Sequence, residues 1–195
     1  MRIYANVRKY PLTHYSYNSN TAPIYDSKVV PDPEDPDHGR QNNQGFEGLT
    51  ISADGKSLFV MLQSAARQEG GASSSKRRNT RLLKYALGSE ITYEAEYVVP
   101  LPTFTNAEGK TRVAAQSEVH YISDTQLLVL PRDSSVGRGQ KDPQSLYRHV
   151  DIVDVSRATN IKGTKFDDLQ NGNITAGGIS DPCQSFSLLL PPNQN

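Results

Sequence analysis

The chain has 195 residues, enough for one domain or slightly more, and its hydrophobic fraction of 35% is low for a globular domain. Lysine and arginine together number 21, as do aspartate and glutamate, and this balance provides no basic field to attract nucleic acid. The sequence has no run of 18 apolar residues to span a membrane and no apolar signal-peptide region at its N-terminus. It has a single cysteine, Cys183, so no disulfide can form within the chain.

Residues 1–44 are expected to form an N-terminal segment with edge strands and a loop rich in proline and aspartate. Three prolines between positions 31 and 36 remove backbone donors, which excludes a central strand or a helix interior there. The acidic stretch 32–37 lacks the spacing and the glycine of an EF-hand, so a solvated loop is the favoured interpretation.

Four strands are predicted next. Residues 45–51 and 57–62 are strand-like runs that flank Asp54 and Gly55, and Asp-Gly between two such runs is a hairpin signal. After a flexible basic loop at 64–79, residues 81–87 and 93–99 form two more strand-like runs, which the turn at 88–90 connects.

The pattern then recurs. Residues 118–122, 126–130 and 147–155 are strand-like, with a polar loop at 133–144, and a fourth strand is expected to start at 159–161. We align Glu47 with Glu118, 71 positions later, and residues 58–60 with 127–129. A repeat of four short strands is typical of a propeller blade. The sequence therefore predicts an all-β partial propeller of about two four-stranded antiparallel blades over 45–162, followed by an irregular tail at 163–195.

The stretch GFEGLTISADGK at 45–56 resembles an element of the phytase-like family, known by the description "esterase-like activity of phytase". Residues 117–133 resemble a second element of that family, with Pro131 where an acidic residue is expected, and 154–168 resemble its fungal members. The resemblance implies a truncated fungal-type member of a family of longer, secreted propellers related to calcium-dependent phytases. A later family element with tryptophan is absent, since the sequence contains no tryptophan.

Glu47 and Glu118 are the first candidate site residues. The first strand of each blade lines the central channel of a propeller, so the two carboxylates are expected to converge there as Ca²⁺ ligands or as general acid and base. The alternative is that each glutamate caps a turn or pairs with a nearby arginine.

Arg132 and Asp133 end the second strand of the second repeat and complete the predicted catalytic set. Arg132 is suited to bind a phosphate or carboxylate, and the alternative is a structural ion pair with Glu118. His120 shares a strand face with Glu118, and a half-buried structural histidine is the favoured interpretation.

The remaining motifs are weak. The basic run 76–78 is interpreted as a solvated loop. Asn173 begins an N-glycosylation acceptor that matters only in a secreted protein, and no nucleophile motif surrounds Cys183.

The preferred hypothesis is a calcium-dependent hydrolase of a small anionic or ester substrate, or a truncated remnant of one, with no protein partner predicted. The alternative is a non-catalytic propeller that serves as a binding scaffold. Two blades alone are expected to be inactive and poorly stable, because they leave sheet edges and an apolar face uncovered.

Overall fold

A computed structural model describes residues 41, 44–71, 73–133, 145–167 and 184–189. These residues contain ten strands and one short 3-10 turn, at Arg67–Glu69. The strands are β1 (Phe46–Ile51), β2 (Ser57–Leu62), β3 (Asn79–Leu87), β4 (Ile91–Pro100), β5 (Thr103–Thr105), β6 (Thr111–Val113), β7 (Ala115–Ser123), β8 (Gln126–Arg132), β9 (His149–Asp154) and β10 (Gln184–Leu189).

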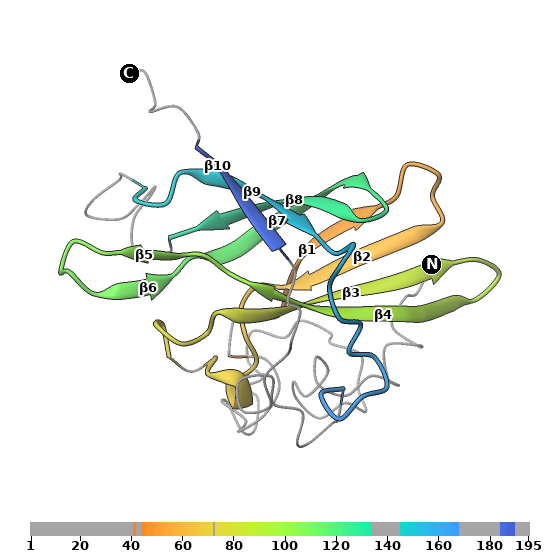
Figure 1. Ribbon diagram of the computed structural model, residues 1–195, viewed down its shortest axis with the longest axis horizontal. Coiled ribbons are helices and arrows are strands. Elements are labelled where there is room, and N and C mark those ends of the chain that lie inside the picture. The colour runs from red at the N-terminus through yellow and green to blue at the C-terminus, as the bar shows by residue number, and fades with distance from the viewer. Residues whose placement is uncertain (1–40, 42–43, 72, 134–144, 168–183, 190–195) are drawn as a thin grey trace, which may run out of the picture.

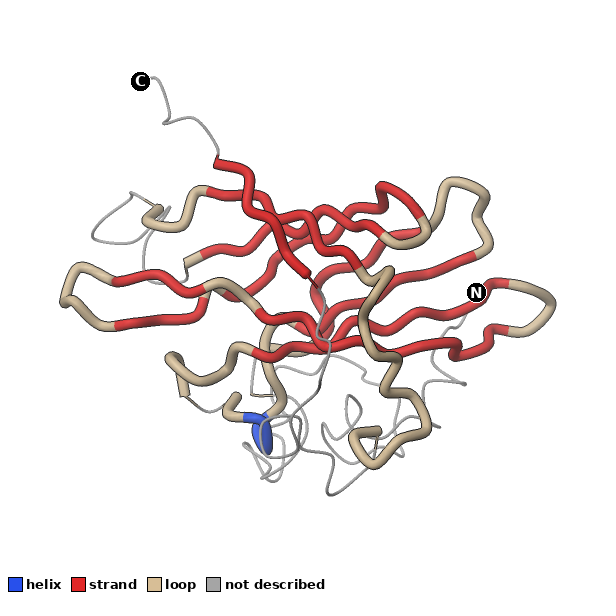
Figure 2. Tube along the Cα trace, in the orientation of Figure 1, coloured by secondary structure: helices blue, strands red, loops and turns tan. Residues whose placement is uncertain are grey.

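The strands form two four-stranded antiparallel sheets and one small hairpin (Figures 1 and 2). The first sheet has the order β1-β2-β3-β4, the second has the order β10-β9-β8-β7, and β5 pairs with β6. The two larger sheets pack face to face, with β1 beside β7 and β4 beside β10. This arrangement confirms the predicted all-β fold with two four-stranded antiparallel units of a propeller.

The predicted hairpin at the start of the first sheet is present. Gly55 has a φ of 72°, the left-handed conformation that glycine adopts without a steric penalty. The Ser52 hydroxyl accepts the Ser57 N–H at 2.8 Å, and the Asp54 carboxylate accepts the Lys56 N–H at 3.0 Å. These bonds fix the turn and therefore the register of β1 against β2.

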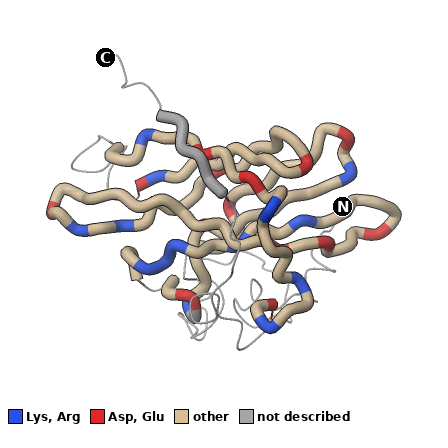
Figure 3. Tube along the Cα trace, viewed as in Figure 1, with Lys and Arg blue, Asp and Glu red and all other residues tan. Residues whose placement is uncertain are grey.

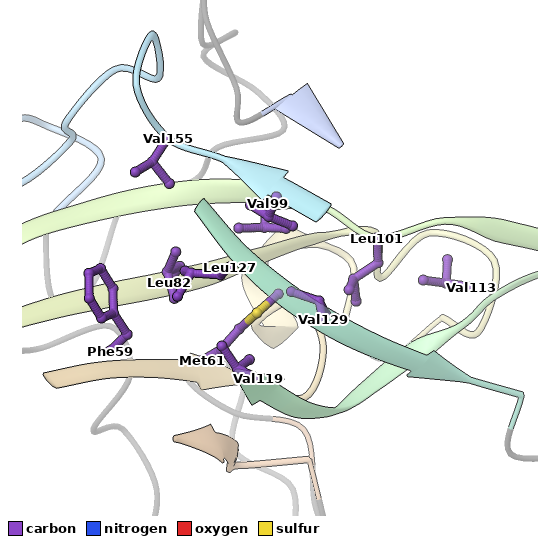
Figure 4. Packing of buried hydrophobic residues seen from close by; sticks show 11 residues of the cluster. Phe59, Met61, Leu82, Val99, Leu101, Val113, Val119, Leu127, Val129 and Val155 are labelled. Atoms are coloured by element: carbon purple, nitrogen blue, oxygen red, sulfur yellow. The ribbon is translucent and has the colours of Figure 1, made fainter. Parts of the chain in front are cut away.

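A shared hydrophobic core lies between the two sheets (Figure 4). Alternate residues of β2 face it, since Phe59 and Met61 are almost fully buried there, whereas Leu58 belongs to a second cluster on the opposite face of the first sheet. Both faces of the first sheet are therefore apolar, as expected for a blade with neighbours on either side. The second sheet contributes the aliphatic residues Val119, Leu127, Val129, Val153 and Val155 to the shared core.

Direct contacts join β1 to β7. The Tyr121 N–H of β7 donates to the Thr50 hydroxyl of β1 at 3.1 Å. Beside this contact, the Gln116 N–H of β7 donates at 3.0 Å to the carbonyl of Gln63, the residue that follows β2. Gly48 lies against Val119 so closely that a Cβ atom at position 48 would overlap the valine side chain. The first strands of the two sheets are thus neighbours, as the inner strands of adjacent blades are.

The hydrogen-bond register corrects the predicted alignment of the two repeats. Gly48 pairs with Met61 in the first sheet, and Glu118 pairs with Leu130 in the second. A bulge precedes each of these pairs, with Glu47 as the additional residue in β1 and Ser117 as the additional residue in β7. The counterpart of Glu118 is therefore Gly48 and not Glu47, whereas the alignment of 58–60 with 127–129 is confirmed.

The expected position of the last strand in the second sheet is wrong. Residues 159–161 form no strand, because Ile161 turns into a small buried cluster with Val98. The fourth strand is instead β10, which pairs antiparallel to β9. It lies within the segment 163–195 that we expected to be irregular. The expected edge strands of the N-terminal segment, at 1–30, the acceptor at Asn173 and the environment of Cys183 lie outside the described residues.

Candidate functional site

Glu47 occupies the bulge of β1, where the strand has one residue more than its partner. The Glu47 side chain is exposed, and β1 forms one edge of the first sheet. Bulges often occur next to active sites because they re-aim a side chain. The position of Glu47 is therefore compatible with a site beside the inner strands.

Glu118 lies on β7, next to Val119, the residue that contacts Gly48 of the first sheet. Its side chain is exposed on the outer face of the second sheet, the face turned away from the shared core. One carboxylate oxygen, Oε1, accepts the N–H of Val119 at 2.9 Å. The other oxygen has no partner among the described residues, so Glu118 combines a local backbone bond with a carboxylate that is accessible to solvent.

Arg132 shares this outer face. Leu130 lies opposite Glu118 in the register, and Arg132 follows two residues later, so the alternation of β8 places the two on the same side. Within the part of the chain that the structure describes, Arg132 forms no ion pair with Glu118. His120 is also exposed on this face, two residues after Glu118. The structure thus brings Glu118, His120 and Arg132 to one face, whereas Glu47 belongs to the neighbouring sheet.

Asp133 has a different environment. The side chain is buried, and its oxygens accept hydrogen bonds from the Ser145 hydroxyl at 2.7 Å, from the Tyr147 N–H at 3.2 Å and from the Leu146 N–H. These bonds fasten the chain that leads into β9. The geometry therefore favours a structural role for Asp133 over the predicted catalytic one.

Calcium in proteins takes six to eight oxygen ligands, from carboxylates, carbonyl groups and water. No group of three or more histidine, cysteine, aspartate or glutamate side chains gathers within the described ranges. Glu47 and Glu118 would therefore need further oxygen ligands beside them to hold the ion.

The sequence analysis missed a buried ionic cluster in the first sheet. Arg81 of β3 is fully buried, and its guanidinium donates to Glu69 at 2.5 Å and 3.3 Å, and to Glu96 of β4 at 2.7 Å. It also donates to the Phe166 carbonyl at 3.0 Å, and the Tyr93 hydroxyl donates to the second oxygen of Glu96. The cluster joins the loop after β2 and the segment after β9 to the outer strands of the first sheet.

Burial and charge act against each other in this cluster. Burial disfavours the charge of Arg81, but the carboxylates of Glu96 and Glu69 outweigh it and raise the pKa of Arg81. Burial raises the pKa of Glu96 despite the adjacent guanidinium, and burial together with the Glu96 carboxylate raises the pKa of Tyr93. Since these side chains are paired and buried, the cluster has a structural role, and removal of one partner would leave an uncompensated buried charge.

Surface charge shows no concentration at the candidate site. Positive and negative side chains are interspersed along the described chain, with a short basic run in the loop before β3 (Figure 3).

An open depression of about 580 Å³ lies at the turn ends of β2, β3 and β4, where Lys84 pairs with Glu94 at 3.2 Å. None of the predicted site residues lines this depression. No helix in the described segments has the length and apolarity to cross a membrane.

The two sheets, their recurring bulges and their contact at the inner strands define part of a β-propeller. The family model for phytase-like proteins, described as "esterase-like activity of phytase", matches residues 12–176. The chain therefore belongs to the phytase-like family, as its sequence elements predicted.

A secreted protein of Arthroderma benhamiae, described as uncharacterized, is 42% identical to this chain over 173 residues. The match covers 85% of this chain but 34% of the fungal protein, so the chain spans about a third of the length of that relative. No solved structure matches the chain.

Proposed function

We propose that this chain forms two blades of a secreted phytase-like propeller that hydrolyses a small anionic ester, with Glu118 and Arg132 as the residues that act on the substrate. The observation that carries the proposal is their common location, exposed and unpaired with each other, on one face beside the inner strand. Membership in a family described by esterase-like activity supports the reaction class.

The chemistry follows from the two side chains. The guanidinium of Arg132 is suited to bind the phosphate or carboxylate of the substrate with two parallel hydrogen bonds. The free oxygen of Glu118 can accept a proton from water as the water oxygen forms its bond to phosphorus or to the acyl carbon. The ester bond then breaks, and the departing oxygen takes up a proton from the protonated Glu118 or from solvent and leaves as the alcohol. Glu47, on the neighbouring strand, would lie at the edge of this site.

The site is incomplete in the two described sheets, because Glu118, His120 and Arg132 face solvent on an open sheet surface. Catalytic groups are effective where water is excluded and the substrate is held in a fixed orientation. We therefore assign turnover to a longer protein of this family and expect the 195-residue chain alone to be inactive.

The test uses the intact Arthroderma benhamiae relative and this chain in parallel. The release of p-nitrophenol from p-nitrophenyl phosphate and p-nitrophenyl acetate is measured with calcium and with a chelator. Replacing the residue aligned with Glu118 by glutamine should lower kcat by about 10²–10⁴-fold, the usual contribution of a general base. Replacing the residue aligned with Arg132 by methionine should mainly raise KM for the phosphate ester.

The matched control is the position aligned with Glu90, an exposed carboxylate in the turn between β3 and β4. Its change to glutamine should leave kcat and KM unaltered. Full activity of the Glu118 variant, or no carboxylate at the aligned position, would contradict the proposed role. Unchanged activity in excess chelator would remove calcium from the hypothesis.

The second candidate is a scaffold that binds a ligand without turnover. The observation in its favour is that the described residues provide no enclosed site at Glu118. A scaffold predicts that the melting temperature of the intact relative rises with inorganic phosphate or another small anion, while no p-nitrophenol is released.

A further inference from the structure

The loop before β3 lies against the small strand β6, and this contact brings two arginines together. The Ser74 carbonyl of the loop accepts the Val113 N–H of β6 at 2.9 Å. Arg77 follows three residues after Ser74, and Arg112 immediately precedes Val113. The two guanidinium groups act on each other, since burial and, after it, the positive charge of Arg112 lower the pKa of Arg77.

The backbone of Arg77 is fixed, whereas its guanidinium is incompletely satisfied. The Arg77 N–H donates to the Ser73 carbonyl at 3.1 Å, and the Arg77 carbonyl accepts the Ala65 N–H at 3.3 Å. The side chain is half-buried, and its Nε is buried without a hydrogen-bond partner among the described residues. A buried donor without a partner costs free energy, and such an atom in a native structure commonly marks a place for water or an ion.

The described part of the chain provides no carboxylate for this pair of cations. Neither Arg77 nor Arg112 belongs to an ion pair there, and Nη1 of Arg112 donates to the adjacent Thr111 carbonyl at 3.1 Å. Lys110 chiefly, and Arg112 more weakly, lower the pKa of Glu108, but Glu108 pairs with Lys110 at 3.0 Å. The fold therefore holds two like charges together, an arrangement that an anion would stabilise.

We propose that Arg77 and Arg112 together bind a doubly charged oxyanion, the phosphate group of a phosphate monoester or free phosphate. A guanidinium presents its N–H donors in a planar fork that matches two oxygens of a phosphate, and two guanidinium groups match its two negative charges. The bound phosphate would also accept the N–H of the buried Arg77 Nε. Neither residue takes part in the proposed hydrolysis, so the inference does not depend on that role.

Arg132 is the alternative that the experiment must separate from this site. The register places Arg132 opposite Ala115, three residues after Arg112. Phosphate that binds to the chain at Arg132 would belong to the proposed hydrolytic site and would not require Arg77.

The experiment is isothermal titration calorimetry of the full chain at low ionic strength with inorganic phosphate, with glycerol phosphate and with acetate. Arg77→Met and Arg112→Met should each raise the Kd for phosphate at least about tenfold, because each removes a charged hydrogen-bond donor. Arg77→Lys keeps the charge but loses the fork, and should raise the Kd by about threefold to tenfold. The matched control is Arg157→Met, an exposed arginine after β9, which should change the Kd less than about twofold.

The three probes identify the ligand. Acetate has one negative charge and should bind at least about tenfold more weakly than phosphate. Tighter binding of glycerol phosphate would assign the site to a phosphate monoester, and tighter binding of inorganic phosphate would assign it to the free ion. Either result supports the proposal.

Thermal unfolding separates ligand binding from a purely structural role. Without phosphate, Arg77→Met and Arg112→Met should melt at or above the wild-type temperature, since one of two repelling charges is gone. Phosphate at 100 times its Kd should raise the melting temperature of the wild type by about 5–10 °C, and that of either variant by about half of this or less.

Four results would overturn the proposal. The first is the absence of phosphate binding to the folded wild-type chain, and the second is acetate binding as tight as that of phosphate. The third is a loss of affinity in Arg157→Met as large as in Arg77→Met. The fourth is a loss of binding in Arg132→Met while Arg77→Met and Arg112→Met retain it, because the phosphate would then belong to the hydrolytic site.

Discussion

Replacement of Gly48 by alanine tests the contact that joins the two sheets. A Cβ atom at this position would overlap Cγ2 of Val119 and would lie 2.8 Å from Oε1 of Gln116 and 3.1 Å from Cβ of Val119. Carbon atoms in contact prefer a separation of about 3.5–4.0 Å. The methyl group therefore requires a displacement of several tenths of an ångström or more in β1 or β7.

Neither strand can move freely. The Gln116 N–H donates to the Gln63 carbonyl at 3.0 Å, and Nε2 of Gln116 donates to the Met61 carbonyl at 3.0 Å. A displacement of β7 weakens both bonds and separates Val119 from the shared core. Inserting a methyl group into such packing costs about 1–3 kcal/mol. For a chain of this size, each kcal/mol lowers the melting temperature by about 2–4 °C.

The assay is thermal unfolding followed by circular dichroism, with Gly88→Ala as the matched control. A Cβ atom at Gly88 meets no atom closer than the Glu90 carbonyl oxygen at 3.7 Å, so this variant should melt at or slightly above the wild-type temperature. The double variant Gly48→Ala with Val119→Ala should lose less stability than the sum of the two single variants, because the smaller side chain removes part of the overlap. Equal melting temperatures for Gly48→Ala and the wild type would refute the close approach of β1 and β7.

Three further predictions concern buried or hydrogen-bonded charges. Arg81→Met leaves Glu69 and Glu96 buried without their cation and should lower the free energy of unfolding by about 3–5 kcal/mol, or prevent folding, in a urea titration. Asp133→Ala leaves two N–H groups of the following loop unpaired and should cost about 1–3 kcal/mol in the same titration. Hydrogen bonds from Ser156 and Gln126 hold the pKa of Asp154 below its ordinary value of 3.8. The stability that Asp154 contributes is therefore present above pH 3.8 and is lost as the pH falls through the lower folded-state pKa, so the advantage of the wild type over Asp154→Asn should shrink in acid.

The first sheet could be predicted from the sequence because its signals are local. The turn at Asp54 and Gly55 and the apolar runs on either side define a hairpin without reference to the rest of the chain. The small hairpin of β5 and β6 was not predicted, since each strand has three residues and offers too short a pattern. Its local signs were the turn residues Asn106, whose side chain accepts the N–H groups of Glu108 and Lys110, and Gly109, which has a φ of 73°.

The last strand of the second sheet was misplaced because its pairing is not local. β10 begins 30 positions after the end of β9, and a sequence pattern does not reveal which distant segment completes a sheet. The short apolar run at 188–190 had no visible partner in the sequence, and the nearer segment 159–161 was expected to occupy the position that β10 takes beside β9. Long-range strand pairing of this kind depends on tertiary packing rather than on propensity.

The placement of the candidate residues in the fold could be predicted in part. The two glutamates are on the first strands of adjacent sheets, but side-chain identity misled the alignment, since a bulge shifts Glu47 out of the position that Glu118 occupies. The buried cluster of Arg81, Glu69 and Glu96 left one signal that was overlooked. Charged residues inside strands that are covered on both faces must be paired, and Arg81 and Glu96 both lie within such predicted strands.

The paired bulges set where the inner strands tolerate a deletion. Each bulge adds one residue to the inner strand, while Gly48 and Glu118 still pair with the residues next to the partners of Phe46 and Gln116. Deleting Glu47 or Ser117 would therefore leave every paired residue on its own face, and only the local bend and the added twist would be lost. Deleting a residue from the regular part of either strand would instead move the residues beyond it to the opposite face.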